Sequence, residues 1–271
     1  MNEIVKYHNE LNEVRLSNFA QTDLDMFMML CAKMKERGTE ELSFTFAELK
    51  PVLSPSNRTD EEFQRDLDRM QVKLGSMTVK LRTETKRTVF NLFPTLEADL
   101  SKRILTVSVN PKFAYLLNEV QKNFTAFELK EFVSLQSKYS KSLYRLLKQY
   151  RSTGSYKISA EDLRRLLDCP EGYEPKFFAR DCLKPAVEEL SSCFADLKVD
   201  PIRGSGRGRP IQEYRFTFKP VRREQAGKDP SIPPKQKPRQ RKNSFNNFSQ
   251  RNYDFAEYER LVLTGGKEES T

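Results

Sequence analysis

The sequence predicts an α+β fold with two tandem domains that share one plan, followed by a disordered basic C-terminal tail. Helix and strand patterns recur in the same order twice along the chain. The 271 residues are 37% hydrophobic, which is enough to give each domain a core. A stretch rich in Pro, Lys and Arg then follows. We expect the boundaries at residues 1–120, 121–219 and 220–271.

The first domain begins with an amphipathic helix over residues 22–37, and Thr22 is its expected N-cap. Two further helices follow, and Thr59 with Glu62 forms the capping box of the third. The expected strands alternate or are β-branched. They cover residues 42–45, 77–82, 88–93 and 104–109, and the second helix covers residues 46–50.

The second domain repeats this order. The segment SYKISAEDLRRLL at residues 155–167 corresponds to SFTFAELKPVL at residues 43–53. Each follows a long amphipathic helix that ends at a glycine, Gly38 in the first copy and Gly154 in the second. Two copies of this size indicate a duplicated domain, because each is large enough to own a core.

The charge of the chain favours a polyanionic partner. Its net charge is +9 and its pI is near 9.3. Lys and Arg against phosphate release counterions and so supply affinity for nucleic acid of any sequence. The alternative at this point is a basic surface that serves only solubility.

Several enzyme classes are excluded by what the sequence lacks. His8 is the only histidine, so no histidine pair can hold a catalytic metal, and rolling-circle initiators that use such a pair are excluded. No G-x-x-x-x-G-K-[ST] phosphate loop is present. The cysteines lack metal-site spacing and are expected to be buried apolar residues. They are Cys31, Cys169, Cys182 and Cys193.

We therefore expect no catalytic residue, no metal and no cofactor. We also expect a cytoplasmic protein without a membrane partner, because the chain shows no run of about eighteen apolar residues and no signal peptide.

The second domain carries the clearest candidate for reading DNA. A helix that begins near Pro175 places Lys176, Arg180 and Lys184 at every fourth position. It is the third helix of its unit, where the helix-turn-helix plan places the element that enters the major groove. A solvated charged face is the alternative interpretation, because Asp181, Glu188 and Glu189 lie nearby.

Two alternating strands, at residues 197–203 and 211–219, follow this helix and are joined by GSGRGRP. Glycines let a hairpin tip approach a surface closely, and arginines at the tip can enter a narrow minor groove. The candidates are Arg203, Arg207 and Arg209. A nucleotide-binding loop is rejected because no helix follows the glycines. The hairpin is typical of the wing of a winged-helix domain.

The first domain has a weaker version of the same pattern. Its candidate DNA contacts are Arg65, Arg69 and Lys73 on the third helix, and Lys80 and Arg82 in a basic hairpin that continues to Lys86 and Arg87. Acidic residues such as Asp66 and Asp68 dilute this charge. The surface either adds general DNA contacts or is a protein contact surface that forms a homodimer.

The tail has two parts. Residues 220–252 hold nine Lys/Arg, two Asp/Glu and several prolines, and are expected to be a flexible basic linker. Residues 253–263 can form a short amphipathic helix that would fold only against a partner. Its partner-binding residues are Phe255, Tyr258, Leu261 and Val262.

Over residues 3–219 the chain resembles the iteron-binding plasmid replication initiators, which pair two winged helices in one chain. The stretches that carry the resemblance are SLQSKYSKSLYRLLKQY (134–150), ISAEDLRRLL (158–167) and FFARDCLKPAVEELSS (177–192), with Pro185 inside a helical pattern. The tail segment FNNFSQRNYDFAEYERLVL resembles the ends of replication proteins from Gram-positive bacteria.

This resemblance implies a protein that binds direct repeats (iterons) in a plasmid origin, helps to open the adjacent duplex, and recruits the host helicase or its loader. Monomers would bind the repeats, and dimers would repress the initiator's own gene. The residues leave two alternatives: a dimeric winged-helix transcriptional repressor, and a non-enzymatic adaptor that acts through residues 253–263.

Overall fold

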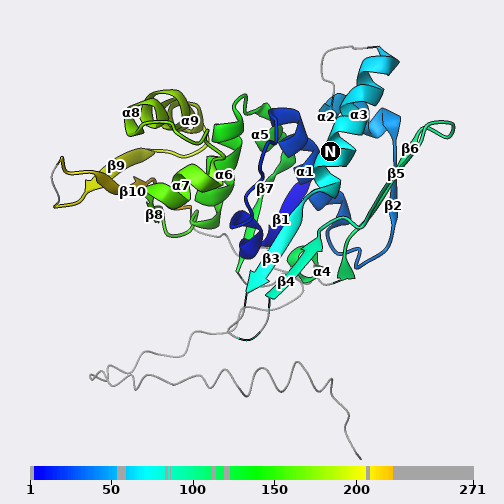
Figure 1. Cartoon of the computed structure of the whole chain (residues 1–271), viewed down its shortest axis with the longest axis horizontal. Helices are drawn as coiled ribbons and strands as arrows, with labels where there is room; N and C mark the ends of the chain where they lie inside the picture. Colours follow the sequence, from blue (N-terminus) through cyan, green and yellow to red (C-terminus); the bar gives the residue numbers. More distant parts are fainter. Residues whose placement is uncertain are drawn as a thin grey trace, which may run out of the picture. The chain divides into compact units, whose positions relative to one another are not determined.

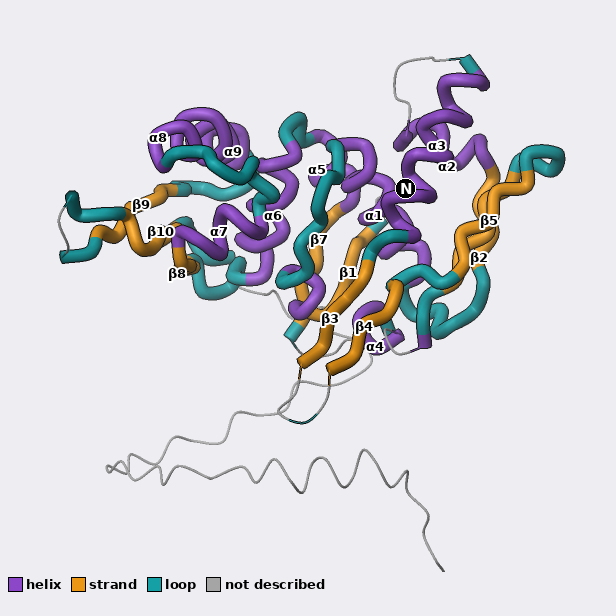
Figure 2. Tube along the Cα trace, in the orientation of Figure 1, coloured by secondary structure: helices purple, strands orange, loops and turns teal. Residues whose placement is uncertain are grey.

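The computed structural model describes residues 3–53, 59–82, 85, 87–111, 114–118, 123–205 and 208–221. Figure 1 traces their helices and strands along the chain, and Figure 2 distinguishes the two kinds of element. Among these residues no helix is both long enough and apolar enough to cross a membrane. Residues 253–263, the expected partner-binding segment, lie outside them.

Three helices and a three-stranded antiparallel sheet form the centre of the first domain. The capping box of the third helix is present, because Thr59 Oγ1 accepts from the Glu62 N–H at 3.3 Å and Glu62 Oε2 accepts from the Thr59 N–H at 3.1 Å. The helices are α1 (Gln21–Met34), α2 (Phe46–Leu53) and α3 (Asp60–Gly75), and the sheet order is β2 (Leu42–Thr45), β6 (Ile104–Ser108), β5 (Thr95–Asp99).

The start of α1 differs from the prediction. The helix begins at Gln21, and its N-cap residue is Ala20, so the prediction of Thr22 as the cap is wrong. Asp23, at the third helical position, supplies one half of a capping box, because its Oδ2 accepts a hydrogen bond from the Ala20 N–H at 2.7 Å. An acidic group in the first turn is also favoured by the helix dipole.

The wing of the first domain is a different hairpin from the basic one. Strand β2 pairs with β6, and β6 pairs with β5, so β5 and β6 form the wing. The basic hairpin is a separate two-stranded ribbon, β3 (Thr78–Arg82) with β4 (Arg87–Asn91), inserted between α3 and the wing. Strand β5 reads TLEAD, and its two acidic residues concealed it from a prediction based on β-propensity.

A second small sheet was also not predicted, and it pairs residues on both sides of the expected boundary between residues 120 and 121. Strand β1 (Ile4–His8) pairs antiparallel with β7 (Phe124–Glu128), and Val5 faces Phe127 in the buried register. Three short helices complete the region: η1 (Asn9–Asn12), α4 (Ala114–Leu117) and α5 (Leu129–Ser134).

The second domain repeats the topology of the first. Its sheet order is β8–β10–β9, so the strand before the second helix pairs with the last strand of the hairpin, as in β2–β6–β5. This shared order supports the predicted duplication. The elements are α6 (Lys138–Gln149), β8 (Ser155–Ser159), α7 (Ala160–Leu166), α8 (Pro175–Phe177), η3 (Phe178–Leu183), α9 (Lys184–Leu190), β9 (Lys198–Arg203) and β10 (Ile211–Thr217).

The predicted third helix of this domain is continuous but contains a π-helical turn, η3. At its end the Lys184 N–H bonds to the Ala179 carbonyl, five residues back. Pro185 has no N–H and cannot make the next α-helical bond, which accounts for a wider turn at this point. We call the whole element, residues 175–190, the reader helix, after the role that the sequence predicts for it.

Helix α6 is shared between the domains. It packs against α9 on one side and against α1, β7 and η1 on another. The Tyr144 ring contacts Phe127 of β7 edge-on at 5.1 Å and Phe194, after α9, at 5.8 Å. Tyr144 is fully buried, so one side chain joins the two cores.

The face of α6 toward the first domain is cationic. Lys141 is fully buried, and its Nζ donates to Asp25 Oδ1 at 2.6 Å and to the Phe132 carbonyl at 2.8 Å. Arg145 donates to the Leu11 carbonyl at 2.8 Å. Burial raises the pKa of Asp25 to about 6, although the charge of Lys141 acts in the opposite direction.

Three cysteines are buried, as expected: Cys31, Cys169 and Cys182. Cys193 is half-buried. Burial raises the pKa of the Cys31 thiol to about 12, which keeps it protonated and unreactive.

Candidate nucleic-acid interface

The reader helix presents its three predicted cations to solvent. The exposed fractions of the side chains are 70% for Lys176, 68% for Arg180 and 75% for Lys184. Lys176 Nζ and the Arg180 guanidinium lie 4.8 Å and 5.0 Å from the centre of the Phe177 ring. The Phe177 ring therefore makes cation–π contacts with two of the three cations.

Each of these cations has an acidic neighbour on or beside the same helix. The shortest contact is between Arg180 Nε and Asp181 Oδ1, at 2.5 Å, and it holds the pKa of Asp181 below its usual range. Lys176 pairs with Glu174 at 3.0 Å, and Lys184 lies 3.8 Å from Glu188. Exposed pairs of this kind contribute little to stability, so exchanging the acid for a phosphate costs little.

The wing is attached to the reader helix through the core. Phe178 of η3 contacts Tyr214 of β10 with ring centres 5.9 Å apart, and both residues are buried. At the tip, Arg203 and Arg209 are exposed, and Arg203 Nη1 donates to the Arg209 carbonyl at 3.2 Å. Arg207 lies outside the described residues. The second domain thus carries a helix with three exposed cations and an arginine hairpin, joined through one core contact.

In the hairpin, Gly204 lies close to the Gln212 side chain. A Cβ at Gly204 would lie 2.5 Å from the Gln212 side chain, and the Gly204 N–H donates to the Pro210 carbonyl at 2.9 Å. Because the amide end of Gln212 is flexible, it could move away from a larger side chain at this position.

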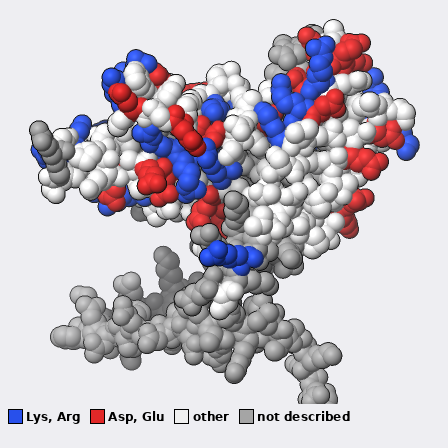
Figure 3. Space-filling model, in the orientation of Figure 1, with Lys and Arg blue, Asp and Glu red and all other residues white. Residues whose placement is uncertain are grey.

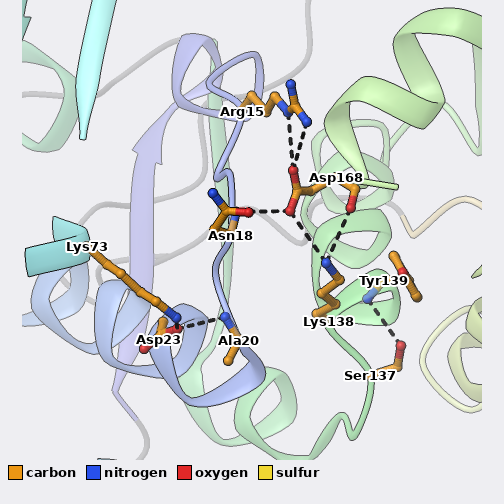
Figure 4. Close-up of polar contacts among 9 residues, drawn as sticks. All are labelled: Arg15, Asn18, Ala20, Asp23, Lys73, Ser137, Lys138, Tyr139 and Asp168. Atoms are coloured by element: carbon orange, nitrogen blue, oxygen red, sulfur yellow. Dashed lines mark hydrogen bonds and ion pairs between the residues drawn. The ribbon is translucent and has the colours of Figure 1, made fainter. Parts of the chain in front are cut away.

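The third helix of the first domain presents fewer free cations. Arg65 is exposed, and Arg69 is half-exposed and pairs with Asp66 at 2.9 Å. Lys73 instead contacts the buried Asp23 at the start of α1, and only 22% of its side chain is exposed (Figure 4). Lys73 therefore joins α3 to α1, and its predicted DNA contact stays a proposal. The side chains of Lys80 and Arg82, and residue Lys86, lie outside the described part of the chain.

The wing of the first domain adds two cations that sequence reasoning missed. Lys102 and Arg103 lie at the β5–β6 turn, with 74% and 57% of their side chains exposed. Asp99 holds this turn, because its Oδ1 accepts from the Ser101 hydroxyl and from two backbone N–H groups. The Asp-x-Ser sequence was the available signal. Figure 3 shows Lys and Arg with Asp and Glu among them over α3 and over the reader helix.

Comparisons with known proteins agree with this architecture. Residues 4–148 match the family described as "Initiator Replication protein, WH1", and residues 159–218 match "Initiator Rep protein, WH2". The first match alone covers more than half of the chain. The chain belongs to the replication initiator family. This initiator therefore carries the two winged-helix domains that the sequence predicted.

A curated relative and a solved structure extend the match. The initiator is 36% identical over 220 residues to "Probable replication protein rep" of Bifidobacterium longum (strain NCC 2705), which covers 80% of this chain and 73% of the relative. Its fold matches the crystal structure of the Pi initiator protein in complex with iteron DNA, with a TM-score of 0.61 and 20% identity, over 80% of this chain and 97% of that one.

Proposed function

We propose that this initiator starts plasmid replication by binding direct repeats in the origin with both winged helices. The observation that carries the proposal is the second domain, where the three exposed cations of the reader helix and an arginine hairpin tip share one core through Phe178 and Tyr214. The solved protein of the same fold is a complex with iteron DNA, which supports repeats of this kind as the target.

The two domains would divide the work. The reader helix would enter a major groove, where Arg180 reads base edges, while Lys176 and Lys184 contact phosphates. The second-domain wing would place Arg203, Arg207 and Arg209 toward the minor groove. Arg65 and Arg69 of α3 would add general contacts in the first domain. Several bound copies would then bend the duplex, and added contacts would offset the bending cost of a few kcal/mol.

Two partners beyond DNA belong to the same proposal. The first domain would form a homodimer that represses the initiator's own gene. The segment with Phe255, Tyr258, Leu261 and Val262 would recruit the host helicase or its loader. A variant with Tyr258→Ala and Leu261→Ala is expected to protect origin DNA as the wild type does and to lose helicase loading at that origin.

Footprinting tests the central claim. The purified full chain would be bound, at near-physiological salt, to DNA that lies upstream of and around its own gene. Regular protection of several direct repeats beside an A·T-rich segment is the expected result. Protection of a single inverted repeat would overturn the initiator proposal in favour of a dimeric repressor. The absence of any specific protection would contradict both and favour the adaptor.

A further inference from the structure

Asp168 occupies a position that suits glycine. It follows α7 and begins the turn that leads to the reader helix. Its N–H bonds to the Arg165 carbonyl, and the Cys169 N–H bonds to the Arg164 carbonyl, which is the usual C-terminal bond pattern of a helix that ends in a left-handed residue. The φ angle of Asp168 is +52°. A side chain costs energy in this conformation, and a negative charge at a helix C-terminus adds to that cost.

The carboxylate of Asp168 contacts the first domain (Figure 4). Its Oδ1 accepts from Arg15 Nε at 3.2 Å and from Arg15 Nη2 at 3.1 Å, and its Oδ2 accepts from the Asn18 N–H at 3.0 Å. Arg15 and Asn18 lie in the segment between η1 and α1. Only 13% of the Asp168 side chain is exposed, while 39% of the Arg15 side chain is exposed, so the contact lies at the edge of the domain contact.

A third donor comes from the shared helix. Lys138 Nζ, at the first residue of α6, lies 3.4 Å from Asp168 Oδ2 and 3.3 Å from the Asp168 carbonyl. A cation at a helix N-terminus is disfavoured by the helix dipole. Asn18 also has a left-handed φ, of +62°. Three locally unfavourable features therefore meet at one carboxylate: the left-handed Asp168, the left-handed Asn18, and Lys138 at a helix N-terminus. Such a combination is typical of a site where tertiary contacts override local preference.

The contact of Asp168 with the first domain lies close to the start of the reader helix. Asp168 is seven residues before Pro175, where the reader helix begins. The intervening turn is braced, because the Arg164 guanidinium donates to the Tyr173 carbonyl and lies 5.5 Å from the Phe178 ring centre. A restraint on Asp168 is thus passed to the reader helix through a short, tied turn.

We propose that Asp168 is a positioning residue that fixes the reader helix relative to the first domain, and so sets the base-pair spacing between the DNA segments that the two domains contact. This inference rests on the proposed function, since it requires that both domains bind the same repeat. Asp168 itself need not contact DNA.

The test compares affinities for repeats of altered spacing. Footprints of the wild-type full chain locate the two segments, and binding is measured on the native repeat and on a repeat with one base pair inserted between them. The wild type is expected to lose about tenfold in affinity on the longer repeat, as for a mismatched site. Asp168→Gly should reduce that loss by at least about threefold, because the domains can then adjust.

Glycine at position 168 keeps the left-handed turn, so the variant is expected to fold, and a thermal melt checks this. Arg15→Ala is the second variant and opens the contact from the first domain, where its side chain is 39% exposed. Glu171→Gln is the control, because it removes one negative charge from the same turn. We define the spacing ratio as the affinity for the native repeat divided by the affinity for the repeat with one base pair inserted, and Glu171→Gln should keep the wild-type spacing ratio.

The outcomes separate the two claims. A wild type that protects no direct repeat would reject the proposed function. Protection of repeats, with the same spacing ratio in the wild type and in folded Asp168→Gly or Arg15→Ala, would overturn the positioning role and leave the function in place. A smaller ratio in both variants, but not in Glu171→Gln, would support it.

Discussion

At the scale of single residues, Arg180 gives the most direct test of base reading. Arg180→Ala is expected to reduce the preference for the repeat over scrambled DNA by about 1–3 kcal/mol, while general salt-sensitive binding persists. Competition binding at two salt concentrations measures both quantities. Lys157→Ala removes the same charge from β8, where Lys157 pairs with Glu213, and should leave the preference unchanged. An equal loss on all DNA would mark Arg180 as a phosphate contact.

The buried pair of Lys141 and Asp25 gives a pH-dependent prediction. Lys141→Met leaves the Asp25 carboxylate buried without its cation, so the free energy of unfolding should fall by about 3–5 kcal/mol at neutral pH. Lys141 opposes the raised pKa of Asp25, so the substitution should raise that pKa above its present value of about 6.

Proton binding decides whether acidification raises or lowers the free energy of unfolding. Between the ordinary pKa of Asp and the raised folded value, the folded state binds more protons than the unfolded state, so acidification stabilises the fold. Urea unfolding of Lys141→Met at pH 7.5 and pH 5.5 should therefore show the smaller deficit, relative to the wild type, at pH 5.5. Lys157→Met is the exposed control. Equal deficits at both pH values would contradict the prediction.

At the scale of elements, the π turn of the reader helix depends on Pro185. Pro185→Ala restores an N–H and allows regular α-helical winding, which rotates Arg180 relative to Lys184. Repeat discrimination should fall, while stability changes by only about 0.4–1 kcal/mol. Binding competition and chemical unfolding measure the two effects. Pro175→Ala, at the first residue of α8, is the matched control. Unchanged discrimination in Pro185→Ala would show that the turn is not needed for reading.

Local signals predicted the elements well, and long-range pairing limited the rest. The capping box of Thr59 and Glu62 and the repeated helix order depend on neighbours within a few residues, and they were predicted correctly. Strand β1 pairs with β7, and Ile4 lies opposite Glu128. The segment MNEIVKYHNE contains no signal that indicates this distant partner strand. The fold class therefore followed from the sequence, while the second sheet did not.

The candidate site divides in the same way. Spacing of four placed Lys176, Arg180 and Lys184 correctly on exposed positions. The same spacing on α3 predicted that Lys73 is a free cation like Arg65 and Arg69. In the structure Lys73 pairs with Asp23, fifty residues earlier. Ion partners are set by tertiary packing, which a periodic pattern does not contain.

At the scale of the whole molecule, α6 should make the two domains unfold together. Tyr144 contacts both cores, so Tyr144→Ala is expected to lower the unfolding free energy by about 3–5 kcal/mol. Hydrogen exchange should show the loss both in β2–β6 and in β8–β10. Tyr115→Ala, at a half-exposed ring, is the control. A loss confined to one sheet would show that the domains are thermodynamically independent.

The shared helix also bears on how such a chain can diverge. Recombination that joined the first domain of one relative to the second domain of another would need a helix α6 that fits two foreign cores at once. Exchange of whole domains is therefore a poor route to a new origin preference. Substitution at exposed positions such as Arg65 and Arg180 disturbs neither core. We expect relatives with different repeats to differ most at these positions and least along α6.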